Sequence, residues 1–371
     1  MQGAVVDVRW LDARSQAWDD LVAQAATPNP FYAARVIEAH RTSGLVADAP
    51  AFAVVTDGAE LLALLPLQPN AAWFGWRRAA RAFASAYTVS SAPLVRPDAD
   101  AAVFDALLGA IAGAAQSDGI VLPLLPIDSF AGTGLRDAAH RRGWPTAQFN
   151  AFPRAVLDRR ENYEIFARDH LGKNRRKGLQ RQRNRLSDLG RLAYRSAQDG
   201  DALTTATEAF LSLEAAGWKG RRGTALVNDP RSEAFARALF GAAAEPVGVR
   251  ADWLDLDNRP IAVSLALVSG GTAWLLKTAY DETLRKCAPG LVLEDEIVRA
   301  MHAEGFCARL DSASLPGGVL EDLYPDREPM ADLVIGLGMT TGAFSRRLRA
   351  EHMRREAITR LKRLKARLTR R

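Results

Sequence analysis

Cysteine, histidine and long apolar runs are scarce in this sequence. Its 371 residues include two cysteines, Cys287 and Cys307, and five histidines. Two cysteines build no disulfide framework, so a reducing compartment and a cytoplasmic location are expected. The histidines and cysteines show no ligand spacing, so we expect no metal. The longest apolar stretches, such as residues 261–268, are too short to cross a bilayer, and the charged N-terminal residues indicate no secretory signal.

The composition is that of a soluble globular protein, and the length suggests roughly two domains. Hydrophobic residues make up 48% of the chain and charged residues 25%, with a net charge of +6. That net charge is unevenly placed: residues 344–371 hold 12 Lys and Arg against 2 Asp and Glu, and residues 168–195 hold 10 against 2. Basicity is therefore concentrated in two segments, and the overall charge alone does not indicate a nucleic-acid-binding face.

The order of predicted elements repeats once along the chain. Residues 51–68 read as a hairpin turning at Asp57-Gly58, and residues 249–269 as a second hairpin turning at Asp257-Asn258. Each hairpin is followed by a strand, a loop, a helix, a glycine and another strand, with Gly119 and Gly305 in corresponding places. This order predicts an internal duplication at the level of fold.

Other elements are predicted from periodicity and turn signals. We expect a strand over residues 5–10, a loop over 73–78, a strand over 81–95, and helices over 101–115, 162–169 and 171–189. The tail after Gly342 reads as a basic amphipathic helix with an apolar stripe at Met353, Ala357, Leu361, Leu364 and Leu368.

The segment from Thr272 to Asp311 carries the strongest functional signal. It reads as a buried strand (residues 272–280), a loop through Pro289-Gly290, a helix ending at Gly305, and a strand. A glycine turn that leads from a strand into a helix presents free amides and the positive end of the helix dipole, which suits phosphate. The corresponding loop of the first half, residues 90–100, has no glycine. We therefore expect the active centre in the second half.

Several stretches of this half resemble a known family. The sequences RRKGLQRQRNRL, EAAGWKGRRGTAL and LLKTAYDE, followed by APGLVLEDEI, resemble the CelD-like, FemABX-related branch of the GNAT acyltransferase superfamily. The resemblance covers residues 163–336 well and the first half only by element order. It implies an α/β (α+β) fold of two tandem GNAT-like domains, with mixed sheets flanked by helices, plus a basic C-terminal helix. The expected boundaries are 1–157, 158–340 with the acyl-donor site, and 341–371.

The resemblance also implies a donor site. Family members bind coenzyme A through an (Arg/Gln)-x-x-Gly-x-(Gly/Ala) loop, which corresponds here to residues 285–290, where Cys or Ala replaces the first glycine. Acyl-CoA, such as acetyl-CoA, is the expected co-substrate, and aminoacyl-tRNA remains the alternative donor. The residues expected at the donor are Thr278, Tyr280, Arg285, Lys286, Gly290 and Leu291.

Direct acyl transfer needs a base for the amine, a donor for the oxyanion and an acid for the thiolate. As a GNAT enzyme, the chain would use a backbone N–H near residues 278–280 for the oxyanion, Asp281 or Asp311 as base, and Tyr324 as acid; Lys277 completes the catalytic candidates. Structural alternatives are an ion pair for Lys277, helix capping for Asp281 and an Asx-turn for Asp311.

The basic loop containing Trp218, Lys219 and Arg221 is the candidate acceptor or phosphate loop, with an ordinary helix C-cap as the alternative. The predicted function is transfer of an acyl group from acyl-CoA to an amine or hydroxyl of a small-molecule, saccharide, lipid or peptide acceptor. Alternatives are an aminoacyl-tRNA-dependent FemABX-type transferase and a non-catalytic protein that binds polyanions or membrane surfaces. The basic helices over residues 173–185 and 344–371 are the candidate contacts for tRNA or anionic lipid.

Overall fold

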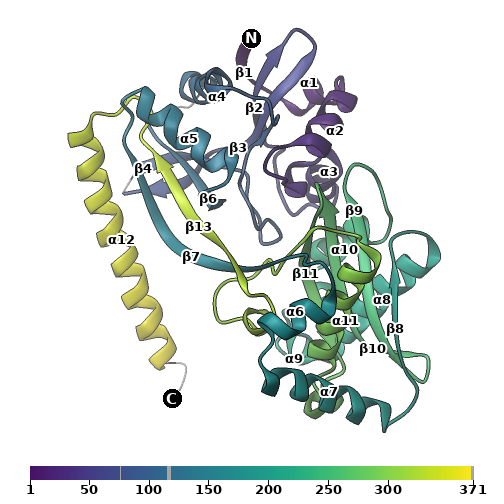
Figure 1. Cartoon of the computed structure of the whole chain (residues 1–371). Coiled ribbons are helices and arrows are strands. Elements are labelled where there is room, and N and C mark those ends of the chain that lie inside the picture. Colours follow the sequence, from purple (N-terminus) through teal and green to yellow (C-terminus); the bar gives the residue numbers. More distant parts are fainter. Residues whose placement is uncertain (76, 115–117, 369–371) are drawn as a thin grey trace.

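The protein consists of two lobes built on one continuous mixed sheet (Figure 1). The computed structural model describes residues 1–75, 77–114 and 118–368. Twelve strands follow in the order β1-β2-β3-β4-β6-β13-β7-β12-β11-β10-β9-β8, and β5 pairs with β3. No helix in these ranges is both long and apolar enough to cross a bilayer.

The first half of the chain contains seven strands and five α-helices within the described residues. The strands are β1 (Gln2–Val6), β2 (Ala51–Asp57), β3 (Glu60–Phe74), β4 (Arg77–Ala82), β5 (Leu94–Val95), β6 (Ile120–Pro126) and β7 (Thr146–Asp158). The helices are α1 (Val8–Asp12), α2 (Ser15–Gln24), α3 (Ala34–Thr42), α4 (Ala101–Ala114) and α5 (Phe130–Arg141).

The second half of the chain contributes the remaining strands and helices. The strands are β8 (Leu192–Ala197), β9 (Gly248–Leu256), β10 (Arg259–Ser269), β11 (Thr272–Tyr280), β12 (Arg309–Asp311) and β13 (Asp326–Ile335). The helices are α6 (Tyr163–His170), α7 (Lys173–Ser187), α8 (Gly200–Ala216), α9 (Trp218–Arg221), α10 (Pro230–Phe240), α11 (Pro289–Glu304) and α12 (Thr341–Leu368). Short 3-10 turns are η1 (Pro30–Tyr32), η2 (Leu226–Asn228), η3 (Glu282–Cys287) and η4 (Val319–Asp322).

Both predicted hairpins are confirmed, as β2–β3 and β9–β10. Asp257 and Asn258 both have positive φ, as a type I′ turn requires. The predicted β11, α11 and the C-terminal helix are also present, and Gly305 ends α11 at φ +68°.

Three predicted elements of the first half are wrong. Residues 8–10 are helical because the Asp7 side chain accepts a hydrogen bond from Trp10 N and caps α1. The expected loop over residues 73–78 lies largely in the β3–β4 hairpin. Within residues 81–95, only β4 and β5 are extended strand; between them Ser85 and Ser90 hydroxyls accept backbone N–H bonds, which replace strand pairing.

The halves exchange strands at the centre of the sheet. β13, from the end of the second half, inserts between β6 and β7 of the first, and β7 in turn pairs with β12. In Figure 1, β7 and β13 run side by side between the lobes. Each lobe's sheet is therefore completed by a strand of the other half, and the predicted boundary at residues 157/158 stays a prediction.

Helices cover both faces of the second-lobe sheet. Helices α8 and α10 pack on one face within a core shared with the first lobe, while α6, α7 and α11 pack on the opposite face around a separate core. A third apolar cluster, including Phe74, Phe149 and Phe344, attaches the start of α12 to the first lobe. These layers bring the strand ends of β11 and the start of α11 to one edge.

Candidate active site

The central feature of the second lobe is a parallel strand pair that separates. β11 and β12 pair only over Thr272–Trp274 and Arg309–Asp311, after which β11 continues to Tyr280. Leu276 is an extra residue, because Leu265 of β10 pairs with Lys277 and Ala266 with Leu275. A bulge of this kind bends the strand and re-aims its main chain, and such bulges are frequent beside active sites. The edge of β11 beyond Trp274 is thereby left without β12 as a partner.

The start of α11 lies beside this gap. Its N-cap residue, Ala288, is in the left-handed region at φ +46° and makes no side-chain cap. The amides of Leu291 and Val292 donate to the Ala288 carbonyl, at 3.0 and 3.1 Å. A Cβ built on Gly290 would lie 3.3 Å from the Tyr280 ring, so glycine lets that ring pack against the helix start. The first turn of α11 is held without an acidic or hydroxyl cap.

A basic groove of about 510 Å³ opens at this helix start. Leu291 lines it from α11, Arg175 and Arg181 line it from α7, and Asp322 lines it from η4. Arg175 pairs with Asp322 at 2.9 Å, whereas Arg181 is exposed. The predicted donor residues Arg285 and Lys286 are exposed in η3, the turn that leads into α11. The helix start thus faces a cationic groove, as a phosphate site requires.

The opposite face of β11 carries Lys277 and the α9 segment. The Lys277 ammonium lies 5.0 Å from the ring centroid of Tyr87, a first-lobe residue. Burial lowers the pKa of Lys277, and the charge of Lys219 lowers it further. Lys219 itself pairs with buried Glu214 at 2.6 Å. Lys277 therefore stands where the lobes meet, away from the α11 groove.

Glu282 joins the predicted acceptor loop to the end of β11. Its carboxylate accepts from the Trp218 amide at 2.6 Å and pairs with Arg221 at 2.5 Å. The Arg221 hydrogen bond, helped by the Trp218 amide, lowers the pKa of Glu282. A cavity of about 450 Å³ lies here, lined by residues of α8 together with Arg221, Arg259 and Tyr280. This cavity and the α11 groove lie on the two sides of the same strand end.

The two candidate aspartates make the contacts that their structural alternatives require. Asp281 accepts from the Thr283 amide at 3.0 Å, caps η3 and pairs with Arg259 at 3.2 Å. Asp311 is buried, accepts from the Ala313 amide at 2.7 Å and faces the Arg154 guanidinium at 3.5 Å. These contacts occupy both carboxylates in the described structure, and their catalytic role stays a prediction.

A comparison with known families identifies this region. Residues 173–317 match the family described as "Acetyltransferase (GNAT) domain". This stretch is a GNAT acetyltransferase domain. The chain is accordingly an acyltransferase, and the matched residues run from the start of α7 past β12. No curated protein matches the chain.

Solved structures extend the likeness to both lobes. FemX is 10% identical, with 89% of this chain and 97% of that chain covered at a TM-score of 0.56. The C-terminal domain (DUF2156) of a candidate lysylphosphatidylglycerol synthetase from Agrobacterium fabrum is 12% identical, with 88% and 92% covered at 0.52. A conserved protein of unknown function from Bacteroides thetaiotaomicron is 12% identical, with 87% and 96% covered at 0.53. The predicted tandem GNAT-like α/β fold and its FemABX-related resemblance are confirmed at the level of fold.

The GNAT domain contains a buried carboxyl that sequence reasoning missed. Glu294 of α11 accepts from the Thr278 hydroxyl at 3.1 Å, and that hydroxyl also lies 3.2 Å from Ser264. Burial raises the pKa of Glu294 to about 8, so the carboxyl is neutral at pH 7. Its sequence position offered a signal, since an acid three residues before Ile297 lies on the apolar face of the helix.

Tyr324, which follows the matched residues in the chain, adjoins Glu294 in the same core. Burial raises the pKa of the fully buried Tyr324 phenol well above its usual value, with a further contribution from Glu294. Neither the Tyr324 hydroxyl nor the second carboxyl oxygen of Glu294 makes a hydrogen bond of normal geometry to a described residue. Such groups are costly unless they serve a purpose or meet a ligand or water. The structure thus places the predicted acid beside a neutral carboxyl, and its catalytic role stays a prediction.

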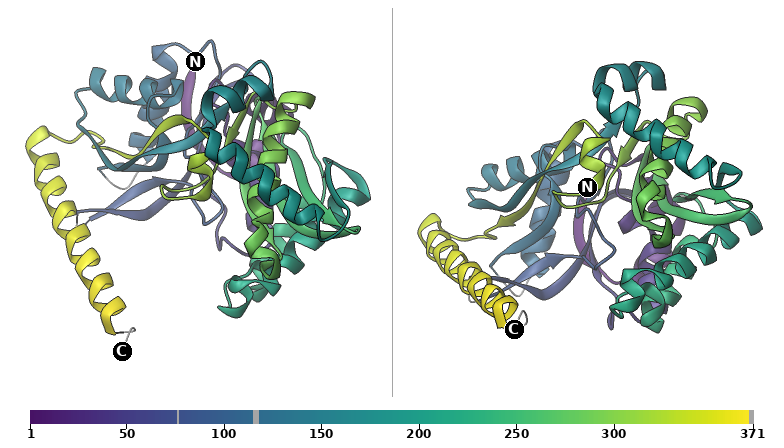
Figure 2. Two further views of the ribbon diagram at one scale, coloured as in Figure 1. Left: turned by 60° about the horizontal axis from the view of Figure 1, so that its bottom comes forward. Right: turned by 90° about the horizontal axis from the view of Figure 1, so that it is seen from below.

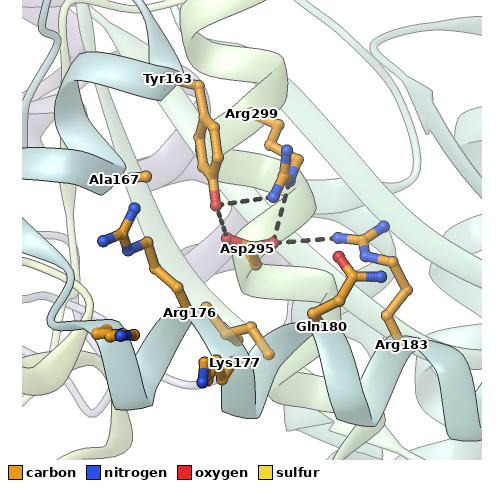
Figure 3. A pocket seen from close by; sticks show the side chains of 10 residues that line it. Tyr163, Ala167, Arg176, Lys177, Gln180, Arg183, Asp295 and Arg299 are labelled. Carbon is orange, nitrogen blue, oxygen red and sulfur yellow. Dashed lines mark hydrogen bonds and ion pairs between the residues drawn. The ribbon is translucent and has the colours of Figure 1, made fainter.

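A second basic pocket of the GNAT domain lies on the other side of α7 (Figure 3). At its wall, Asp295 of α11 accepts from the Tyr163 hydroxyl at 2.5 Å, from Arg299 at 3.0 Å and from Arg183 at 3.1 Å. Three donors on one buried carboxylate make this a structural link between α6, α7 and α11. The pocket of about 470 Å³ is completed by three exposed cations that form no ion pair with described residues, Lys173, Arg176 and Lys177.

Proposed function

We propose that the protein transfers an acyl group directly from acyl-CoA to an amine or hydroxyl of its acceptor. The observation that carries this proposal is the separation of β11 from β12 beside an uncapped helix start that faces a basic groove. A thioester donor needs both features. The helix start and the basic groove can bind its diphosphate, and the free strand edge can donate main-chain N–H groups at its acyl end.

The donor is assigned to the α11 side of the strand. The Gly290 amide in the first turn of α11 and the guanidinium of Arg181 would hold the diphosphate, since the Leu291 and Val292 amides already donate to the Ala288 carbonyl. The free edge of β11 after the Leu276 bulge would take the pantetheine arm and offer N–H groups to the oxyanion near residues 278–280. Tyr280, packed on Gly290, would separate the diphosphate from the reacting end.

The acceptor is assigned to the cavity beside α9. In the reaction the acceptor nitrogen or oxygen bonds to the thioester carbon, the C–S bond breaks, and the acceptor proton is passed to a base while the thiolate receives one from an acid. Tyr324 is the proposed acid, with Glu294 as its neutral neighbour. Lys277, with its lowered pKa, joins Asp281 and Asp311 as a candidate base. Arg221 and Glu282 line the acceptor cavity, and Trp218 lines a small pocket that shares Glu282 and Tyr280 with it.

Calorimetric titration with acetyl-CoA, longer acyl-CoAs and free coenzyme A tests the donor assignment. We expect binding by the wild-type chain and a loss on the order of fivefold to tenfold for Arg181→Gln, since one charge-assisted contact is removed. Arg185→Gln is the matched control, because this arginine is exposed on the same helix but lines neither basic pocket. Absence of heat with every ligand, or equal losses in both variants, would contradict the proposal.

Aminoacyl-tRNA is the second candidate donor, and one observation favours it. The cations of α7 line both basic pockets, so they extend well beyond what one diphosphate contacts. If the donor is aminoacyl-tRNA, the wild type should shift charged tRNA in a mobility assay, and neutralising Lys173, Arg175 and Arg176 together should abolish that shift. The wild type and this triple variant should then both bind acetyl-CoA weakly or not at all. A wild-type chain that binds acetyl-CoA and does not shift tRNA excludes this candidate.

A further inference from the structure

The first turns of α12 are anchored firmly to the first lobe. Phe344 is buried, and Arg347 donates to the Phe74 carbonyl and pairs with Asp118. Buried Glu351 accepts from the Gly75 amide at 2.9 Å and pairs with Arg354 and with Arg355, which follows it in the helix. These contacts fix the direction in which the rest of the helix runs.

Beyond these contacts α12 stands clear of the body. Every residue from Glu356 to Leu361 is exposed, and the views in Figures 1 and 2 show the helix continuing past the lobe that anchors it. Met353 and Leu361 are two turns apart on one side of the helix and are 60% and 65% exposed. Ile358, which lies roughly 60° round the helix from Leu361, is also exposed. A free helical segment of this length gains little from helix propensity alone, which points to an occupant of this face.

The charge of this segment indicates the occupant. Residues 352–371 contain nine Lys and Arg against one Asp or Glu. An anionic surface complements that charge, and the apolar residues interleaved with it need a hydrocarbon phase, which RNA phosphates lack. A second copy of the helix would bring like charges together along the seam.

We propose that the distal part of α12, residues 352–368, docks in the plane of a bilayer that contains anionic phospholipid. Met353 and Leu361 enter the headgroup boundary, and Arg360 contacts lipid phosphates. The anchored turns at Arg347 and Glu351 hold the acyltransferase body next to that surface. This assignment is independent of which acyl donor the GNAT domain uses.

Flotation of the full chain with vesicles tests the proposal. We expect binding to vesicles of phosphatidylcholine with phosphatidylglycerol, little binding to phosphatidylcholine alone, and release by high salt. Leu361→Ser should weaken binding severalfold, and its matched control is Leu315→Ser, which is equally exposed at 65% elsewhere on the surface. Arg360→Gln should weaken binding on the order of fivefold, the effect of one basic residue near an anionic surface, whereas Arg185→Gln on α7 should not.

Folding is not expected to confuse the result, because Leu361 and Arg360 are exposed and thermal unfolding of each variant should match the wild type. The proposal is overturned if the chain ignores phosphatidylglycerol, or if Leu361→Ser and Leu315→Ser behave alike. Binding to RNA without binding to vesicles, or dimerisation that Leu361→Ser abolishes without any vesicle binding, would assign the helix to another partner.

Discussion

Helices α4 and α11 occupy corresponding places in the two halves, yet their first turns differ. The Asp100 side chain accepts hydrogen bonds from the amides of Ala102 and Val103, so a carboxylate already fills the start of α4. Ala288 leaves the start of α11 without a side-chain cap, facing a basic groove. The same helix position can serve stability or anion binding, and a carboxylate there excludes phosphate.

The strands that precede these helices differ in how far they extend beyond their last parallel pair. β4 pairs in parallel with β6 at Ala80 and Arg81 and ends at Ala82, whereas β11 runs on well past its last pair with β12. The buried residues of α4 are all apolar, while α11 buries Glu294 and Asp295. The family match over residues 173–317 coincides with the half that keeps the open strand edge and polar core. We infer that the first half mainly supports the domain of the second half.

The largest expected effect concerns the polar core that only α11 has. The raised pKa of Glu294, about 8, means that the unfolded chain releases this proton near pH 4.5 while the folded chain keeps it. Between these values the folded state binds more protons, so its stability falls as pH rises. Glu294→Gln cannot ionise and can still accept from Thr278. Because only the wild type loses stability in this way, the difference in unfolding free energy between Glu294→Gln and wild type should rise by roughly 3 kcal/mol from pH 5 to pH 8.

Urea unfolding of both proteins at the two pH values measures this difference. Parallel stability curves for wild type and Glu294→Gln would show that Glu294 is ionised in the fold. In that case burial of Glu294 under α11 would not make stability depend on pH, and the polar core of α11 would not differ from the apolar core of α4 in this respect.

The next prediction concerns a substitution that gives the start of α11 the carboxylate cap that α4 has. Ala288→Asp would place a carboxylate at the N-cap, where Asp tolerates the left-handed conformation better than most residues. We expect acetyl-CoA affinity to fall about 30-fold, because the Gly290 amide becomes occupied and a like charge faces the diphosphate. Ala288→Gly is the control: it relieves backbone strain and should leave affinity within about twofold. Calorimetry gives both values, and undiminished binding by Ala288→Asp would place the donor elsewhere.

Local chemistry made part of this arrangement predictable from sequence. Asp57-Gly58 and Asp257-Asn258 fix turns through their own backbone preferences, and Pro289 and Gly305 mark the ends of α11, so these elements were foreseen. The exchange of β7 and β13 between lobes was not, because strand pairing over such distances depends on partners that no local pattern encodes. The Leu276 bulge was missed for the same reason.

The site residues divide in the same way. Gly290 and Leu291 were predicted because a helix start has a local signature, and Leu291 lines the basic groove, while the binding role of both residues stays a prediction. Glu294 was missed, since its pKa depends on burial by residues distant in sequence. Lys277 was predicted as a catalytic residue and Thr278 as a donor-site residue, and the pleat turns these two neighbours to opposite faces of β11.

The smallest expected effect comes from removing the side-chain cap at the start of α4 in the first half. Asp100→Ala removes the carboxylate that caps α4 and should cost about 1 kcal/mol of stability, as the loss of an N-cap usually does. It should create no second donor site, because β4 ends beside its last pair and leaves no free strand edge for a pantetheine arm. Urea unfolding checks the first expectation, and the stoichiometry of acetyl-CoA binding checks the second. A rise from one bound donor to two would mean that an open helix start suffices, and that the separated strand in the second half is not what selects the donor.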